Sequence, residues 1–151
     1  MQNSPLQLNS LFVGDFELKP APTPGPFQTK VNVTTEINYG RNEDNMKQWL
    51  VELVVRFKSP DEQPIQYVGA VKIEGIFTVL PVMEEPQHLR LVAVTCPTIL
   101  YGTAREVIAN LTARGKHGVF LLPSVSFADQ QIKESPDKEK RVTVTPEPAR
   151  Q

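Results

Sequence analysis

The residues with the clearest chemical potential are one cysteine and two histidines. Cys96 is the single cysteine of the 151-residue chain, and the histidines are His88 and His117. A cysteine just before a helix can have a lowered pKa, because the amide dipoles at a helix start favour the thiolate. Cys96 would act as a nucleophile only with a base beside it. Neither histidine has an informative spacing to Cys96, so the sequence favours a small buried residue at a helix entrance.

Two other groupings give equally little support for catalysis. A metal site built from Cys96, His88 and His117 would lack a fourth ligand, and no paired spacing such as CxxC or HxxxH occurs. Glu84 and Glu85 could act as an acid/base pair, but adjacent carboxylates followed by proline are typical of a solvated loop. We predict a protein that is not an enzyme and that holds no cofactor and no metal.

The composition narrows the classes of partner. Sixteen basic and seventeen acidic residues leave a net charge of -1, which argues against a nucleic-acid binder with a basic surface. No stretch approaches the roughly 18 to 20 apolar residues of a membrane span. Residues 1–12 have neither the basic region nor the long apolar region of a signal peptide. We therefore expect a cytoplasmic protein without membrane insertion.

Four extended segments must provide the framework for these residues. The first, residues 6–19, is apolar in both parities, which predicts a bulge or a strand buried on both faces. Three more segments alternate apolar and polar side chains, as half-buried antiparallel strands do. They are residues 31–39, 49–58 and 65–79. Gly75 interrupts the last segment and predicts a bulge or a close backbone approach. Prolines at alternate positions in residues 20–26 predict an extended crossover between strands that are not neighbours.

A helical period follows the strands. Apolar residues recur at helical spacing from Leu100 to Leu111, which predicts a helix over residues 97–114 with Pro97 in its first turn. Arg114 and Gly115 are predicted to form its basic last turn and its terminal glycine. Strands followed by a helix indicate an α+β fold with an antiparallel sheet.

The remaining apolar material has no obvious place in such a fold. One helix covers one face of the sheet, yet the first strand, Phe27 and residues 119–123 are also apolar. Uncovered apolar surface of this kind is typical of proteins that oligomerise or bind apolar partners. Residues 128–151 lose apolar periodicity, which predicts a short helix at most and then a mobile tail.

Several segments resemble the SecB family of protein-export chaperones. Residues 96–106 are similar to the family's CP-x-ILFPYARE pattern, and Arg114-Gly115 is similar to its helix end. Further similar segments are residues 16–20, 75–77 and 122–127. The resemblance spans about residues 6–127, which we take as a SecB-like chaperone domain, with residues 128–151 as a short helix and mobile tail.

The resemblance implies a four-stranded Greek-key sheet with a long helix beneath it, in a homotetramer built as a dimer of dimers. It also implies an ATP-independent holdase that binds unfolded polypeptides in apolar grooves. Carried over by position, the groove residues are Phe27, Val31 and Val33, with Leu121 as a further candidate. Each of these side chains is equally compatible with ordinary core or interface packing.

The sequence departs from the family where the export motor SecA would bind. The family docks SecA on an acidic patch, in which Asp15 keeps one position and Val68 keeps only an apolar character. Lys19 and Ala70 stand where acidic residues are expected, and residues 135–151 are not similar to the family's SecA-binding tail. The alternative is a dedicated SecB-like chaperone of a toxin–antitoxin–chaperone system, which protects the antitoxin.

Overall fold

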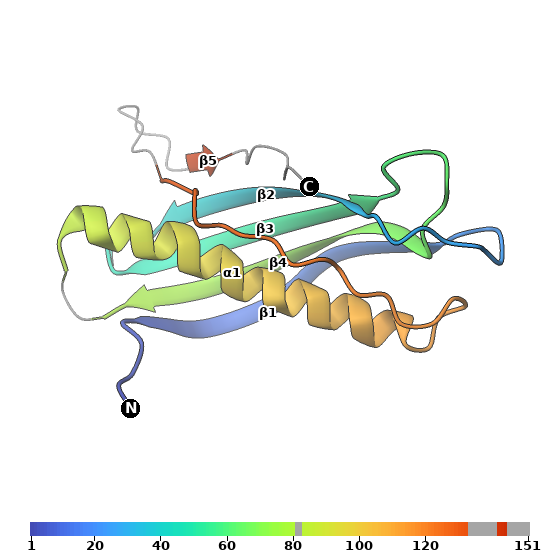
Figure 1. Ribbon diagram of the computed structural model, residues 1–151. Coiled ribbons are helices and arrows are strands. Elements are labelled where there is room, and N and C mark those ends of the chain that lie inside the picture. Colours follow the sequence, from blue (N-terminus) through green and yellow to red (C-terminus); the bar gives the residue numbers. More distant parts are fainter. Residues whose placement is uncertain (81–82, 133–141, 145–151) are drawn as a thin grey trace.

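In the computed structural model, the described residues form four long strands, one long helix and a short fifth strand (Figure 1). The structure describes residues 1–80, 83–132 and 142–144. The elements are β1 (Leu6–Pro20), β2 (Asn32–Arg41), β3 (Gln48–Lys58), β4 (Tyr67–Val79), α1 (Glu85–Thr112) and β5 (Val142–Val144). The predicted α+β class and the four predicted strands are confirmed, whereas β5 was not predicted.

The sheet is antiparallel, with the strand order β1-β4-β3-β2-β5. Since β4 and β3 lie between β1 and β2, the proline-rich segment that joins β1 to β2 crosses the end of the sheet past these two strands (Figure 1). Three consecutive strands beside a first strand that pairs with the last of them form a Greek key. The crossover and the Greek-key sheet therefore agree with the prediction.

The irregular apolar pattern of β1 arises from bulges, as the sequence predicts. The pairing of β1 with β4 shifts register between Leu8 and Ser10 and again between Val13 and Phe16. Gly75, in contrast, pairs without a shift on both sides. A Cβ at Gly75 would lie 2.6 Å from Cε2 of Phe77 and 3.0 Å from Cδ2 of Leu100, so a close approach of side chains explains this glycine.

The helix begins twelve residues before its predicted start at Pro97. Pro86 occupies its first turn, and Pro97 lies inside it. The prediction was wrong because the apolar stripe continues upstream, where Val92 and Cys96 are fully buried like Leu100. Cys96 is therefore a mid-helix core residue and has no place at a helix entrance.

Pro97 is tolerated inside α1 because β2 supplies a missing hydrogen bond. A proline has no N–H, so the carbonyl four residues earlier, that of Ala93, loses its partner in the helix. The hydroxyl of Tyr39 donates to this carbonyl oxygen at 2.8 Å, and both residues are buried. The hydrogen bond fixes β2 against the middle of α1.

The end of α1 also differs from the prediction. The helix ends at Thr112 with Ala113 as its cap, and its last turn holds no basic residue. Gly115 has an ordinary backbone conformation, and its N–H donates to the carbonyl oxygen of Thr112 at 2.8 Å. A Cβ at Gly115 would lie 2.3 Å from the hydroxyl of Tyr67, so packing against the sheet explains this glycine.

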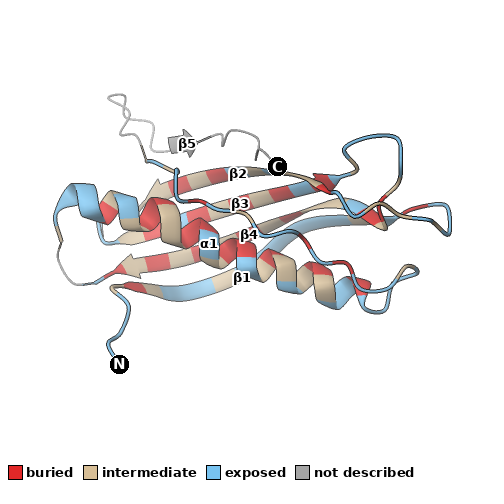
Figure 2. Ribbon diagram, in the orientation of Figure 1, coloured by how far each residue is buried: buried red, intermediate tan, exposed pale blue. Residues whose placement is uncertain are grey.

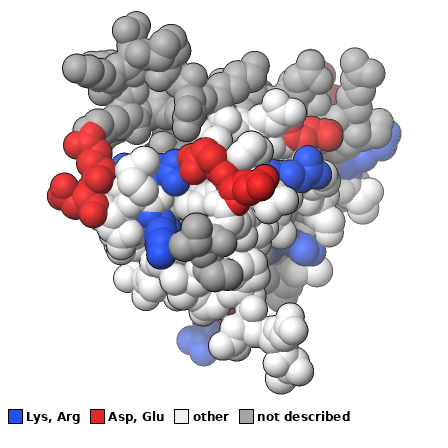
Figure 3. Space-filling view, turned by 90° about the vertical axis from the view of Figure 1, so that its left-hand side faces the viewer, with Lys and Arg blue, Asp and Glu red and all other residues white. Residues whose placement is uncertain are grey.

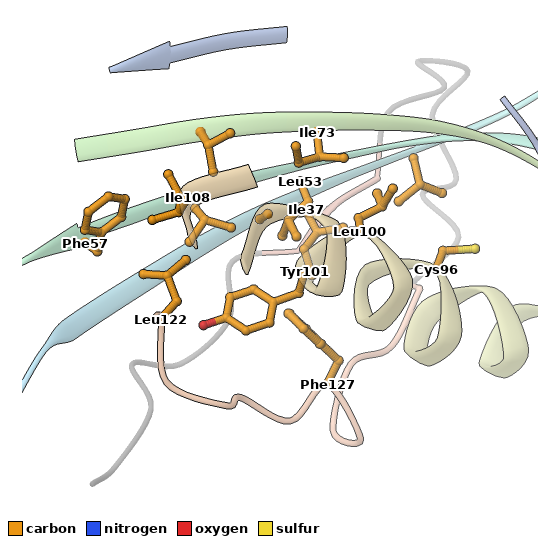
Figure 4. Packing of buried hydrophobic residues seen from close by; sticks show 14 of the residues in the cluster. Ile37, Leu53, Phe57, Ile73, Cys96, Leu100, Tyr101, Ile108, Leu122 and Phe127 are labelled. Carbon is orange, nitrogen blue, oxygen red and sulfur yellow. The ribbon is translucent and has the colours of Figure 1, made fainter. Parts of the chain in front are cut away.

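Residues 119–132 run back along α1 and complete the layer on the helix-bearing face (Figure 1). Phe120 and Leu122 are buried, and Leu122 and Phe127 lie beside Tyr101 (Figure 4). The Nε–H of Arg105 donates to the carbonyl oxygen of Leu122 at 3.1 Å, and the N–H of Phe120 donates to Oγ1 of Thr112 at 2.8 Å. Alternate residues of the apolar run after the helix are thus buried, while Val119 and Leu121 between them are exposed.

No helix forms within residues 128–132, which make a turn and then have no regular secondary structure. The rest of the predicted tail, except β5, lies outside the described residues. β5 pairs with β2 over three positions, Ile37↔Val144, Asn38↔Thr143 and Tyr39↔Val142.

The helix α1 is long and apolar enough to span a membrane by length and composition, with a mean hydropathy of 1.2 over an 18-residue window. The prediction that no stretch approaches a membrane span is therefore wrong for length and composition. Yet Val92, Leu100 and Ile108 are fully buried, and α1 packs on β3 and β4, as the core helix of a sheet does (Figure 2).

The bond between Tyr39 and Ala93 predicts a non-additive pair of substitutions. Tyr39→Phe leaves a buried carbonyl without a donor, so the free energy of unfolding should fall by about 1–3 kcal/mol. In the background of Pro97→Ala, residue 97 regains an N–H for that carbonyl, and the same substitution should cost less than half as much. Urea unfolding of the four proteins measures the difference. Equal costs in the two backgrounds would show that the hydroxyl does not replace the missing helix bond.

Candidate apolar binding surface

An exposed apolar stripe follows β1 on the helix-bearing face. Leu8, Val13 and Phe16 pair with Phe77, Ile73 and Val71, which are buried beneath the helix layer. Since paired residues share a face, the three side chains of β1 point to the same side as α1. They are 42%, 41% and 55% exposed, because α1 packs on β3 and β4 and leaves β1 uncovered (Figure 2).

A second apolar group gathers where the crossover, the end of α1 and the following segment meet. Phe120 stacks on Phe57 with ring centroids 5.6 Å apart and meets Tyr67 edge-on at 6.2 Å. Val33 is the register partner of Phe57 on β2. Leu121 follows Phe120 directly and is 66% exposed. We call these five residues the aromatic end.

Of the four predicted groove residues, Val33 and Leu121 belong to the aromatic end. Phe27 is linked to it because both Phe27 and Tyr67 contact the ring of His117, and Val31 belongs to the hydrophobic core. Val31 is a buried core residue, while Phe27 and Val33 are half-buried. Leu121, which the sequence placed last among the candidates, presents the most surface of the four. Their role in binding stays a prediction.

His117 holds this end together, and sequence reasoning missed it. Its Nε2–H donates to the carbonyl oxygen of Ala21 at 2.7 Å, and its own N–H donates to the Tyr67 hydroxyl at 2.8 Å. Its ring meets the Phe27 ring edge-on at 4.8 Å. The histidine therefore ties the crossover to the turn after α1. Its partners lie 50 and 96 positions away, so no local pattern could have shown them.

The positions predicted to contact the motor lie apart from this surface. Val68 lines an open hollow of about 430 Å³ on the opposite face of the sheet, together with Lys19, Ala70 and Arg56. Asp15 lies in the second register shift of β1 and does not line the hollow. Lys19, Arg56 and Lys58 line this hollow with one acidic residue, Glu17, so its charged lining is basic. Lys19 pairs with Glu17 at 2.7 Å, and Arg56 pairs with Glu36 at 3.3 Å.

The residues considered for catalysis are spread along α1. His88 lies in its first turns, His117 follows its end, and a helix of 28 residues is about 40 Å long. Cys96 is fully buried, and burial raises the pKa of its thiol. The Glu85 carboxylate accepts hydrogen bonds from Arg41, which lowers its pKa. Within the described ranges, no group of three histidine, cysteine or carboxylate residues could hold a metal ion.

The surface can bind apolar chains, and the described part of the chain assembles no catalytic group around it. The exposed stripe lies beside a rigid layer of α1 and residues 119–132, and apolar contact stabilises by about 25 cal/mol per Å² buried. Such contact does not depend on a particular side-chain sequence in the partner. Fold and surface together define an α+β protein with an exposed apolar surface that can bind other chains.

Comparison with known proteins identifies the family. A family described as "Preprotein translocase subunit SecB" matches residues 1–135. The "Protein-export protein SecB" of Psychrobacter cryohalolentis is 29% identical over 132 residues, covering 86% of each chain. That of Rhodopseudomonas palustris strain TIE-1 is 30% identical over 131 residues, covering 83% of each. The chain belongs to the SecB family of protein-export chaperones.

A solved structure supports the fold. The chain is similar, with a TM-score of 0.60, to the SecB-like chaperone of Mycobacterium tuberculosis in complex with a ChAD peptide from an antitoxin. The match covers 80% of this chain and 88% of that one, at 14% sequence identity. The antiparallel sheet followed by one long helix is common to both.

The burial of Cys96 predicts an unreactive thiol. A raised pKa leaves little thiolate near neutral pH, and the packed helix excludes reagents. The native protein should react with a soluble aromatic disulfide at less than one-tenth of the rate of the urea-unfolded chain at pH 8. Comparable rates in the two states would contradict the burial and reopen a nucleophilic role for Cys96.

Proposed function

We propose that the protein is an ATP-independent holdase that binds unfolded polypeptides on its apolar surface and keeps them soluble. The observation that carries this proposal is the exposed apolar stripe of β1, next to the aromatic end with its exposed Leu121. Membership of a family of protein-export chaperones supports a binding function without catalysis. Phe27, Val31, Val33 and Leu121 are proposed as the residues that line the binding groove.

The protein acts as a homotetramer, a dimer of dimers, under this proposal. β1 is the edge strand of the sheet, and its apolar side chains extend past the helix layer. A second copy would cover part of that stripe, since an open apolar edge otherwise favours uncontrolled association. Several weak binding sites on one assembly would then act together, which raises avidity by roughly 10² to 10⁴.

Two kinds of client fit the surface, and the general one is favoured. Curated relatives named for protein export support unfolded secretory chains as clients. The structural similarity to a chaperone bound to an antitoxin peptide supports a dedicated antitoxin as the alternative. The basic lining of the hollow around Val68, with Asp15 outside it, favours clients over SecA as the principal partner, because the family docks SecA on an acidic patch.

The proposed function is assigned to residues 1–127, without the C-terminal segment. Residues 1–127 form the chaperone domain, which acts in the cytoplasm without cofactor or metal. Residues 128–151 are an appended segment.

Client binding can be tested with a pair of leucines on opposite faces. Leu121→Asp places a charge on the proposed surface, and an unfolded client should bind about fivefold more weakly, the effect of losing about 1 kcal/mol. Leu50 is 47% exposed on the opposite face of the central strand β3, so Leu50→Asp is the matched control and should bind normally. Binding of a labelled, reduced and unfolded lactalbumin, measured by anisotropy without ATP, gives both affinities. Equal losses in both variants, or none in either, would contradict the proposed surface.

The oligomeric state gives a separate test. Phe16→Asp introduces a charge into the β1 stripe, and burial of a phenylalanine side chain is worth about 1.5–3 kcal/mol. Light scattering should show a tetramer for the unmodified protein and for Leu50→Asp, and a smaller species for Phe16→Asp. A monomeric unmodified protein would refute the assembly.

A further inference from the structure

The start of α1 is joined to the sheet by a buried hydrogen bond between two rings. The Nε1–H of Trp49 on β3 donates to Nε2 of His88 at 2.8 Å. Trp49 is 3% exposed and His88 is 6% exposed. An indole nitrogen can only donate, so Nε2 of His88 carries no proton and the ring is neutral, with its proton on Nδ1.

Charged groups from two elements surround this pair. From β2, Nη2 of Arg41 lies 3.5 Å from Nε2 of His88, and the guanidinium carbon lies 5.1 Å from the centre of the Trp49 ring. From the first turn of α1, Glu85 forms an ion pair with Arg41. Figure 3 shows acidic and basic side chains side by side at the end of the molecule where α1 begins. Among the described residues, Arg41 and Glu85 are the charges that act on His88.

This environment opposes protonation of the ring. Burial contributes most to the lowered pKa of His88, the Arg41 charge lowers it further, and the Glu85 charge acts in the opposite direction. A proton on Nε2 would also face the N–H of Trp49 and bring a second positive charge next to Arg41.

We propose that Trp49 and His88 form an acid-sensitive contact that fastens the start of α1 to β2 and β3. When His88 takes up a proton, Trp49 loses its acceptor and the first turns of α1 separate from the sheet. The contact is independent of the proposed client surface, which lies along β1 and at the other end of the helix.

The sign of the pH effect follows from the folded and unfolded states. The unfolded chain binds the proton near the ordinary histidine pKa of about 6.5, whereas the folded chain binds it only at lower pH. The contribution of His88 to stability is therefore complete above pH 6.5. It is lost as the pH falls from 6.5 towards the lower pKa of the folded state.

The single tryptophan of the chain makes this contact directly observable. Fluorescence of Trp49 in the full-length protein should change between pH 7.5 and pH 5, and the urea midpoint should fall over the same range. In His88→Gln, whose amide oxygen accepts a hydrogen bond but does not titrate, the fluorescence change should disappear and the fall should be at least halved. His117→Gln removes the other histidine and is the matched control, in which the fluorescence change should persist.

A second measurement covers the case in which His88→Gln does not fold. Nitrogen NMR of the unmodified protein should show His88 with a bare Nε2 at pH 7, and the indole N–H signal of Trp49 should shift with the titration of His88. An unchanged pH response in folded His88→Gln would overturn the proposal. So would a His88 ring that titrates while the Trp49 signal stays constant.

Discussion

The carbonyl group of Ala93 is the point on which the packing of this molecule depends. Pro97 removes its partner within α1, and Tyr39 on β2 replaces that partner with a buried hydrogen bond. A buried carbonyl without a donor costs free energy comparable to a lost hydrogen bond, so α1 is held in register over β2, β3 and β4. Leu100 and Ile108 are then completely buried against the strands (Figure 4).

The position of α1 determines what remains uncovered. The helix and residues 119–132 close the core over the middle of the sheet, and β1 keeps exposed apolar side chains beside them (Figure 2). The exposure of Phe16 on β1 and of Leu121 after the helix results from this arrangement. The single chain therefore combines a closed core with an apolar margin along β1 and at Leu121.

Much of the fold could be predicted from the sequence, because strand alternation is a local signal. Trp49 to Phe57 alternate cleanly and form β3 as expected. The helix start could not be predicted, because a proline is usually found in the first turn of a helix. Pro97 lies inside α1 because Tyr39, distant in the sequence, donates a hydrogen bond to the Ala93 carbonyl that the proline leaves without a partner. The family was predicted from a resemblance over about residues 6–127, with residues 96–127 as its most specific part, and is confirmed by the match over residues 1–135.

Less of the candidate site could be predicted. Leu121 was among the predicted groove residues, but its exposure depends on how Phe120 and Leu122 pack on α1 and the sheet. His88 and His117 were considered only as ligands or bases, whereas both make structural contacts with residues 39 to 96 positions away. Such contacts follow from the assembled sheet and helix, and no spacing in the sequence encodes them.

Hydrogen exchange with and without an unfolded client tests the central claim most directly. The account predicts slower exchange of backbone amides in β1 and residues 119–122 when client is bound, with no change at the solvent-facing positions around Leu50. Protection confined to β4 around Val68 and Ala70, with none in β1 or residues 119–122, would contradict the account. It would place binding on the face that α1 leaves to solvent.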